Sequence, residues 1–352
     1  MLKELDGFRA LAVTLVVLFH AGFYTKAIPG FNEVIGTGYL GVQIFFILSS
    51  LLLSRQNLLY YPQTVNKKQY TLTFFKKRLL RIVPLYLISS IVLAAFSYKS
   101  IDFSFWKIIQ YVLFIKDDLH VNVVIWSLFV EVRFYILLPV LMGVLFSLQK
   151  HKVTIFLVPV LVILYSYWYR YTQLSLPYNK EISERLYSSL SANVDCLGWG
   201  MIIAILYERY KALLFKPATI TAIATLLLVL IFGLMYVQYH KVYPPLVRIV
   251  TPLNNICWSA LILMVMLGKT TIFNKILSAK AAVYVSMLSY SIYLWHLPIR
   301  TYIVEVLQQL LTGNSAKYIV VLQLILTLGL SLLVSALSYR FIEKPFLNKK
   351  SA

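Results

Sequence analysis

Ten long apolar stretches follow one another along this chain, and they constrain its fold more than any other feature of the sequence. Each is close to the length that a helix needs to cross the ~30 Å hydrocarbon core of a bilayer. A segment in lipid must satisfy its own backbone hydrogen bonds, so continuous apolar runs predict helices. We therefore expect an all-α integral membrane protein with about ten transmembrane helices. The stretches are residues 10–25, 38–54, 80–97, 121–146, 153–169, 190–207, 218–239, 250–267, 282–311 and 318–341.

The rest of the chain shows no sign of a second domain. Hydrophobic residues make up 60% of the 352 residues and charged residues 13%, too few polar side chains for the surface of a water-soluble globule. We find no internal repeat or linker, so residues 1–352 are expected to form a single transmembrane domain. Segment 103–115 is apolar but short, which favours an interfacial or re-entrant helix. The longest polar interval, roughly residues 55–78, is interpreted as a cytoplasmic loop.

The distribution of basic residues sets the expected orientation. Lys and Arg accumulate in short loops on the cytoplasmic side of membrane proteins. With ten spans and both termini cytoplasmic, 21 of the 33 Lys and Arg residues lie inside and 11 lie in outer loops. The formal net charge of +20 is then mostly a topology signal, with some contact to anionic membrane lipids. Nucleic-acid binding is not expected, because no soluble region is long enough for a binding domain.

Only two cysteines occur, Cys196 and Cys257, and both lie within predicted spans. They indicate neither a disulfide framework nor a metal site, so we expect no metal cofactor.

Arg9 and His20 lie eleven residues apart in the first apolar stretch. Eleven helical steps make about three turns, so both side chains share one face, about 16 Å apart along the axis. Ionisable groups near the middle of a bilayer are costly and are therefore candidates for function. Imidazole suits proton transfer at cellular pH, which favours His20 as a general base.

Other ionisable residues fall at a similar predicted depth, namely Glu131, Arg133 and His296, and Asp195 lies nearer the outer face. Buried charges are tolerated where they pair or face water, so we predict a polar cavity enclosed by the first, fourth, sixth and ninth stretches. Packing pairs that hold helices together are an equally good explanation for Glu131 and Arg133, which point about 200° apart. Interfacial anchoring would explain the aromatic neighbours of His296, and a helix kink would explain Pro298.

A basic run, FFKKRLLRIVP, lies at the expected cytoplasmic entry of the third span. Lys76 and Lys77 fit positive-inside anchoring and contact with anionic lipids. Arg78 and Arg81 lie on one helical face and lead into apolar sequence, where lipid contact explains less. Arginine forks match phosphate geometry, so this pair predicts a site for a phosphorylated cofactor.

Seven motifs run in order from Leu5 to Phe346: R-x10-H, GYLGVQIFFILSS, FFKKRLLRIVPLY, WSLFVEVRFYILLP, a D-x-x-G-W-G segment, LSYSIYLWHLPI and SYRFIEKPF. In this order they resemble the membrane-bound acyltransferase 3 family, which includes O-antigen and other cell-envelope O-acetyltransferases. The resemblance implies a ten-helix enzyme of a bacterial inner or cytoplasmic membrane. Such an enzyme takes an acyl group, most commonly acetyl, from cytoplasmic acyl-CoA and delivers it to a hydroxyl of a carbohydrate or lipid-linked glycan.

The resemblance also assigns residues. It makes Arg9 and His20 the essential pair, and Arg78 and Arg81 the CoA-facing motif, with Lys77 at a position where some members have a second arginine. Further site or supporting positions are expected at Glu131, Arg133, Asp195, His296 and Glu343.

This sequence departs from the family pattern in two other places. Residues Leu48 to Ser50 read L-S-S where the family usually has S-G, which would alter local helix packing. No esterase-like extracellular domain is expected after Phe346, so a handover between fused domains is not expected either.

Together these features give a hypothesis of acyl transfer. Arg78 and Arg81 hold the phosphates of acyl-CoA, and Arg9 orients or neutralises the donor. His20 serves as general base or transient acyl carrier, and Glu131 fixes its tautomer or stabilises its charged form. A transporter or polysaccharide exporter would also need ten spans and buried charges. An inactive family member acting as an assembly partner is a third alternative, and homo-oligomer formation stays open.

Overall fold

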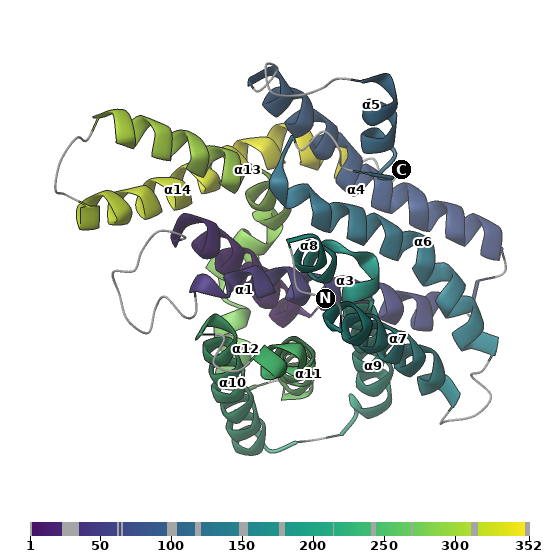
Figure 1. Ribbon diagram of the computed structural model, residues 1–352. Helices are drawn as coiled ribbons and strands as arrows, with labels where there is room; N and C mark the ends of the chain where they lie inside the picture. Colours follow the sequence, from purple (N-terminus) through teal and green to yellow (C-terminus); the bar gives the residue numbers. More distant parts are fainter. Residues whose placement is uncertain are drawn as a thin grey trace.

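A computed structural model of the protein describes residues 2–22, 35–61, 63–64, 66–96, 104–116, 121–147, 154–175, 180–213, 215–240, 244–268, 270–310 and 316–348. All regular elements within these ranges are helical, which confirms the predicted all-α class (Figure 1). Eight helices of the described chain are long and apolar enough to cross a membrane. The chain is therefore a multi-pass membrane protein.

Each predicted apolar stretch corresponds to a helix. Residues 23–25 of the first stretch lie outside the described residues. The long helices are α1 (Lys3–Gly22), α3 (Gly41–Tyr60), α4 (Lys67–Phe96), α6 (Trp126–Ser147), α7 (Leu157–Leu174), α9 (Leu190–Tyr210), α10 (Pro217–His240), α11 (Pro244–Gly268), α13 (Lys280–Leu310) and α14 (Ala316–Ser338). The short ones are η1 (Gly38–Leu40), α5 (Phe105–Val112), η3 (Val123–Ile125), η4 (Thr154–Phe156), α8 (Lys180–Ser188), α12 (Ile272–Leu277), the π-helical turn η5 (Tyr339–Glu343) and α15 (Lys344–Asn348).

The eight apolar helices leave out two of the predicted spans, α1 and α13. Both are helical over the expected residues, and both carry ionisable side chains, including Arg9, His20 and His296. The count of ten spans and the orientation of the termini therefore remain predictions.

The interpretation of residues 55–78 as a loop is wrong for most of its length. Helix α3 continues to Tyr60, and α4 already begins at Lys67. Lys and Gln are good helix formers, so α4 extends beyond its apolar part without any hydrophobic signal. The basic run thus lies inside α4, about two and a half turns after its first residue. Helix α5 has eight residues and is about 12 Å long, too short to span, as predicted for segment 103–115.

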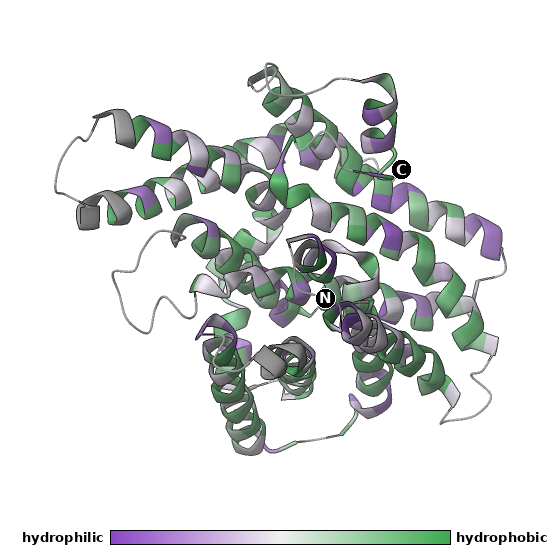
Figure 2. Ribbon diagram, viewed as in Figure 1, coloured by the Kyte–Doolittle hydropathy of each residue, from purple (hydrophilic) through white to green (hydrophobic). Residues whose placement is uncertain are grey.

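Helix α1 lies between α3 and α13, and the site is built around it (Figure 1). Helix α3 packs against α9, which also contacts α7 and α11. Helix α10 packs on α11, and α14 packs on α13. The outer helix α10 exposes large apolar side chains such as Leu226, Val229 and Phe232, and Figure 2 shows a nearly continuous hydrophobic colour along it. Such a surface suits contact with lipid.

Two glycines allow the helices around the site to approach closely. A Cβ added to Gly41 would lie 2.4 Å from the carbonyl oxygen of Ala12 in α1, and one added to Gly200 would lie 2.5 Å from Cβ of Ser50. Small residues at helix crossings permit this approach in membrane proteins. Ser50 also donates a 2.6 Å hydrogen bond to the carbonyl of Leu197. The L-S-S departure therefore supplies a polar tie between α3 and α9.

Candidate active site

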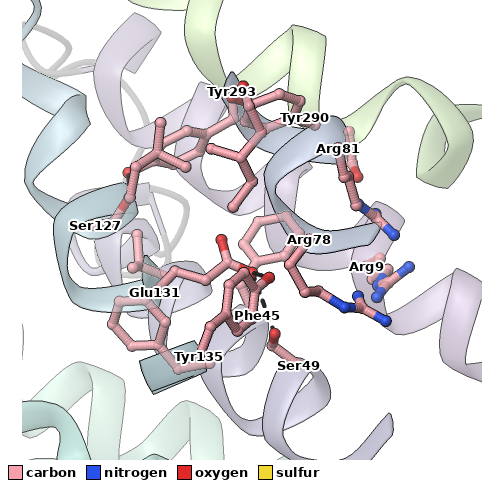
Figure 3. A pocket seen from close by; sticks show the side chains of 15 residues that line it. Arg9, Phe45, Ser49, Arg78, Arg81, Ser127, Glu131, Tyr135, Tyr290 and Tyr293 are labelled. Atoms are coloured by element: carbon pink, nitrogen blue, oxygen red, sulfur yellow. Dashed lines mark hydrogen bonds between the residues drawn. The ribbon is translucent and has the colours of Figure 1, made fainter. Parts of the chain in front are cut away.

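The first of two cavities near α1 is basic, and we call it the basic cavity. It measures about 70 Å³. Arg9 reaches it from α1, and Arg78 and Arg81 reach it from α4. Figure 3 shows these three side chains on one side of the cavity, with Ser127 on the opposite side and Glu131 between them. Its other polar lining residues are Ser49, Tyr135, Ser289, Tyr290 and Tyr293.

Arg78 shows why this cavity suits an anion. Its Nε is buried and has no hydrogen-bond partner in the described chain. Its guanidinium carbon lies 5.9 Å from the ring centres of both Phe74 and Tyr135. A buried donor without an acceptor is costly, and phosphate or carboxylate oxygens would satisfy it. Three guanidinium groups and one carboxylate leave the cavity with an excess of positive charge.

Two residues with predicted roles lie elsewhere than expected. Lys77 does not line the basic cavity, although it stands next to Arg78 in the sequence. Glu131 accepts a 3.1 Å hydrogen bond from Ser49 Oγ and another from the hydroxyl of Tyr135, both of which line the basic cavity. Its carboxylate therefore lies with the arginines, and the partners of His20 Nδ1 are the Val16 carbonyl and His296.

The second cavity, the histidine cavity, contains His20 and measures about 510 Å³. Its walls are rich in aromatic rings: the ring centre of Tyr187 lies 5.5 Å from that of Tyr39 and 4.5 Å from that of Trp126. Polar side chains complete the lining, namely Gln43, Arg170, Asn193, Gln238 and Thr251. A cavity of this size and mixed character suits a small organic ligand.

His20 is paired with the fully buried His296. Carbonyl oxygens only accept, so His296 Nδ1, 2.8 Å from the Tyr293 oxygen and 3.1 Å from that of Ile292, carries a proton. His296 Nε2 then accepts from His20 Nδ1 at 3.0 Å. The carbonyl of Val16, also 3.0 Å from His20 Nδ1, requires the same proton position. This pattern leaves the lone pair of neutral His20 on Nε2, as a base requires.

Pro298 lies two residues after His296 and explains why a side chain from outside α13 bonds to the backbone of this helix. Proline has no backbone N–H, so the carbonyl of Leu294 loses its helical partner. Asn122 replaces this partner by donating from Nδ2 at 3.0 Å. The side-chain oxygen Oδ1 of Asn122 also accepts from the backbone N–H of Val124, 3.3 Å away, at the start of η3. One amide thus links the proline site of α13 to the segment that leads into α6.

Val42 and Tyr293 line both cavities and therefore form the wall between them. The hydroxyl of Tyr293 accepts from Ser127 Oγ at 2.8 Å and donates to the Val124 carbonyl at 3.0 Å. Arg9 and His20 face the interior of the bundle, but they line separate cavities.

Asp195 lies outside both cavities. It is fully buried, 3.1 Å from the Arg170 guanidinium, and accepts a 2.8 Å hydrogen bond from Asn255. Sequence reasoning missed Arg170, which it placed in an outer loop, although Arg170 lines the histidine cavity. A charge at the end of an apolar run gives no sign of whether it turns inward.

Arg133 and Glu343 also lie outside the cavities and tie elements together. Arg133 donates to the carbonyl of Ile115 at 2.7 Å, which anchors the segment after α5. Glu343, placed by the π-helical turn, accepts a hydrogen bond from Ser291 of α13.

The aromatic neighbours of His296 make hydrogen bonds within the helix bundle. Tyr290 donates to the Ile82 carbonyl at 2.8 Å, and Trp295 donates to Ser338 at 3.2 Å, so both connect α13 to neighbouring helices. Tyr293 is buried at the wall between the cavities. The motif SYSIYLWHLP contained these residues, but the hydrogen-bond partners of their polar groups could not be predicted from the sequence alone.

The fold and the site define a multi-pass membrane protein with an arginine-lined cavity beside a larger cavity that contains His20. The family model described as an acyltransferase domain, of the acyltransferase 3 type, matches residues 2–340, so the chain belongs to this family.

The similar curated proteins carry related names. The chain is 26% identical over 381 residues to O-acetyltransferase OatA of Staphylococcus aureus strain NCTC 8325, covering 99% of this chain and 57% of that protein. It is 24% identical over 379 residues to a putative O-acetyltransferase of strain COL, covering 97% of this chain and 56% of that protein. The chain thus spans just over half the length of these relatives. No solved structure matches it.

Proposed function

We propose that this chain is a membrane-bound O-acyltransferase that moves an acyl group, acetyl in the first instance, from cytoplasmic acyl-CoA to a hydroxyl of a cell-envelope carbohydrate or lipid-linked glycan. The observation that carries this proposal is the pair of adjoining cavities, one with three arginines and the other with an imidazole base. Donor and acceptor need such neighbouring sites if they are to react in a fixed geometry.

The basic cavity fits the anionic part of the donor. Arg78 and Arg81 supply planar forks for phosphate oxygens, and Nε of Arg78 supplies one donor that no group of the described chain uses. Arg9 adds a third positive charge on the same side of the cavity (Figure 3). Such an excess of charge also attracts the polyanionic donor from solution.

The histidine cavity fits a sugar-like acceptor. Its volume of about 510 Å³ lies in the usual range of small-molecule sites. The faces of Tyr39, Trp126 and Tyr187 offer apolar surfaces to the C–H side of a sugar ring. Asn193 and Gln238 lie in the same lining and offer hydrogen bonds to its hydroxyls.

His20 provides the base for transfer. Its Nε2 takes the proton of the acceptor hydroxyl while the hydroxyl oxygen bonds to the thioester carbonyl carbon and the C–S bond breaks. The imidazolium then gives this proton to the departing thiolate, so atoms and charge balance. His296 Nε2 accepts from His20 Nδ1 and thereby stabilises the imidazolium and fixes its ring.

A nucleophilic role for His20 is the alternative route, in which its Nε2 bonds to the acyl carbon before the acceptor does. The two routes differ without acceptor. Incubation with isotope-labelled acetyl-CoA followed by peptide mass spectrometry yields a labelled His20 peptide only if the nucleophilic route operates.

The wider setting rests on the relatives. Their names describe O-acetyltransferases of a bacterium, which supports a bacterial cell membrane and O-linked acetyl transfer for this chain. The transporter alternative loses support, because the chain belongs to an acyltransferase family.

The test uses purified protein in lipid nanodiscs with acetyl-CoA and envelope glycan. We expect release of free CoA together with O-acetylated glycan detected by mass spectrometry. The His20→Ala protein, folded to the same extent, should give neither. CoA release without acylated glycan, or full turnover by His20→Ala, would contradict the proposal.

A further inference from the structure

The wall between the two cavities carries one more inference, which rests on the proposed function. Only Val42 and Tyr293 contribute to both linings in the described chain. Val42 is short, and its side chain lies on α3, whereas Tyr293 is a large ring on α13. The phenol ring of Tyr293 is therefore the main movable part of this wall.

Two hydrogen bonds and one ring contact hold the side chain of Tyr293 in the position that separates the two cavities. Its hydroxyl accepts from Ser127 at 2.8 Å and donates to the Val124 carbonyl at 3.0 Å, and its ring centre lies 6.3 Å from that of Phe45. Each neutral hydrogen bond contributes about 0.5 to 1.5 kcal/mol net, so both can be broken during turnover. Rotation of this ring away from α6 would join the two cavities.

The same residue also touches the catalytic pair. The backbone carbonyl of Tyr293 accepts the 2.8 Å hydrogen bond that places the proton of His296 on Nδ1, and His296 in turn contacts His20. The position of the Tyr293 ring and the orientation of His20 thus both depend on one turn of α13, which is followed by Pro298 in the same helix.

We propose that Tyr293 is a gate and positioning residue: its ring closes the passage between the arginine-lined and the histidine-lined cavity, and its displacement admits the acyl thioester to His20. A closed ring keeps water and the acceptor away from the thioester until both substrates are present. The gate therefore suppresses hydrolysis of the donor.

Accessibility of a single cysteine tests the gate without any need for activity. Ser49 lines the basic cavity but not the histidine cavity. We therefore place the probe there as Ser49→Cys, in a protein whose two native cysteines are replaced by serine. A membrane-impermeant methanethiosulfonate cation is applied to either side of sealed vesicles. The parent protein is expected to react slowly from one side. From that side, the cysteine at position 49 should be labelled at least tenfold faster in the Tyr293→Ala variant than in the parent protein.

Tyr290→Ala is the matched control. Tyr290 is also a tyrosine of α13, one turn away, and it lines the basic cavity but not the histidine cavity. Its removal should give no new labelling from that side. Equal gain with Tyr290→Ala, no gain with Tyr293→Ala, or fast labelling of the parent from both sides would overturn the gate.

Turnover separates this proposal from the proposed function. In Tyr293→Ala, CoA release without acceptor should rise at least tenfold relative to acyl transfer, whereas Tyr293→Phe, which keeps the ring, should change this ratio far less. If the labelling result holds but no variant releases CoA, the gate stands and the acyltransferase assignment to acyl-CoA fails. If the parent transfers acyl groups but labelling does not change, the gate fails alone.

Discussion

In the proposed mechanism two imidazoles have unequal roles. His20 provides the free lone pair, and His296 holds the other ring nitrogen of His20. We expect His20→Ala to lower turnover at least ~10³-fold and His296→Ala roughly 10- to 100-fold, since an orienting group contributes less than the base. Because the two act as one unit, the double variant should be no worse than His20→Ala. CoA release by equal amounts of folded protein measures this, and additive losses would show that His296 acts independently.

Arg78 should determine donor affinity through its geometry as well as its charge. Arg78→Lys keeps the charge but removes the fork and the buried Nε, so we expect the KM for acetyl-CoA to rise about tenfold with a smaller change in kcat. Lys77→Ala is the control, because Lys77 is next to Arg78 in the sequence but does not line the basic cavity. Steady-state kinetics at varied acetyl-CoA distinguish them. An unchanged KM in Arg78→Lys would mean that positive charge alone, and not the fork, binds the donor.

Single residues also show the limits of sequence reasoning about the site. Arg9, Arg78 and Arg81 could be found because charges stand out in apolar sequence, and the structure places all three in one cavity. The contact between His20 and His296 could not be found, since 276 positions separate them. The hydrogen bonds of Glu131 to Ser49 and Tyr135 could not be found either, because depth along a helix does not determine which neighbour a side chain meets.

At the scale of helices, the tie between Asn122 and α13 makes a separate prediction. Asn122→Ala leaves the Leu294 carbonyl buried without a donor and should lower stability by about 1 to 3 kcal/mol. In a Pro298→Ala background the restored backbone N–H can bond that carbonyl, so the same change should cost less. Thermal unfolding of the four proteins in one detergent completes the cycle. Equal losses in both backgrounds would show that Asn122 acts elsewhere.

The existence of the long helices could be predicted from the continuous apolar stretches, whereas the residues at which the helices end could not. Lys67 begins α4 in a polar segment, and the π-helical turn that buries Glu343 continues the last long helix beyond its apolar part. Neither extension lies in a strongly apolar stretch, so hydropathy carried no signal for it. Hydrogen bonds and packing against neighbouring helices set these ends, and they depend on residues far away in the sequence.

For the whole molecule, the length of α5 decides which side later loops face. Helix α5 is too short to span, so α4, α6, α7 and α9 are the four crossings between Gln63 and Ala212, and an even number returns the chain to the same side. Cysteines at these two exposed positions should therefore react with an impermeant maleimide from one side, and Glu181→Cys from the other. A spanning α5 would put Gln63 and Ala212 on opposite faces. It would also move the loop after α9, with Arg209 and Lys211, away from the side that collects basic residues, against the charge distribution that orients membrane helices.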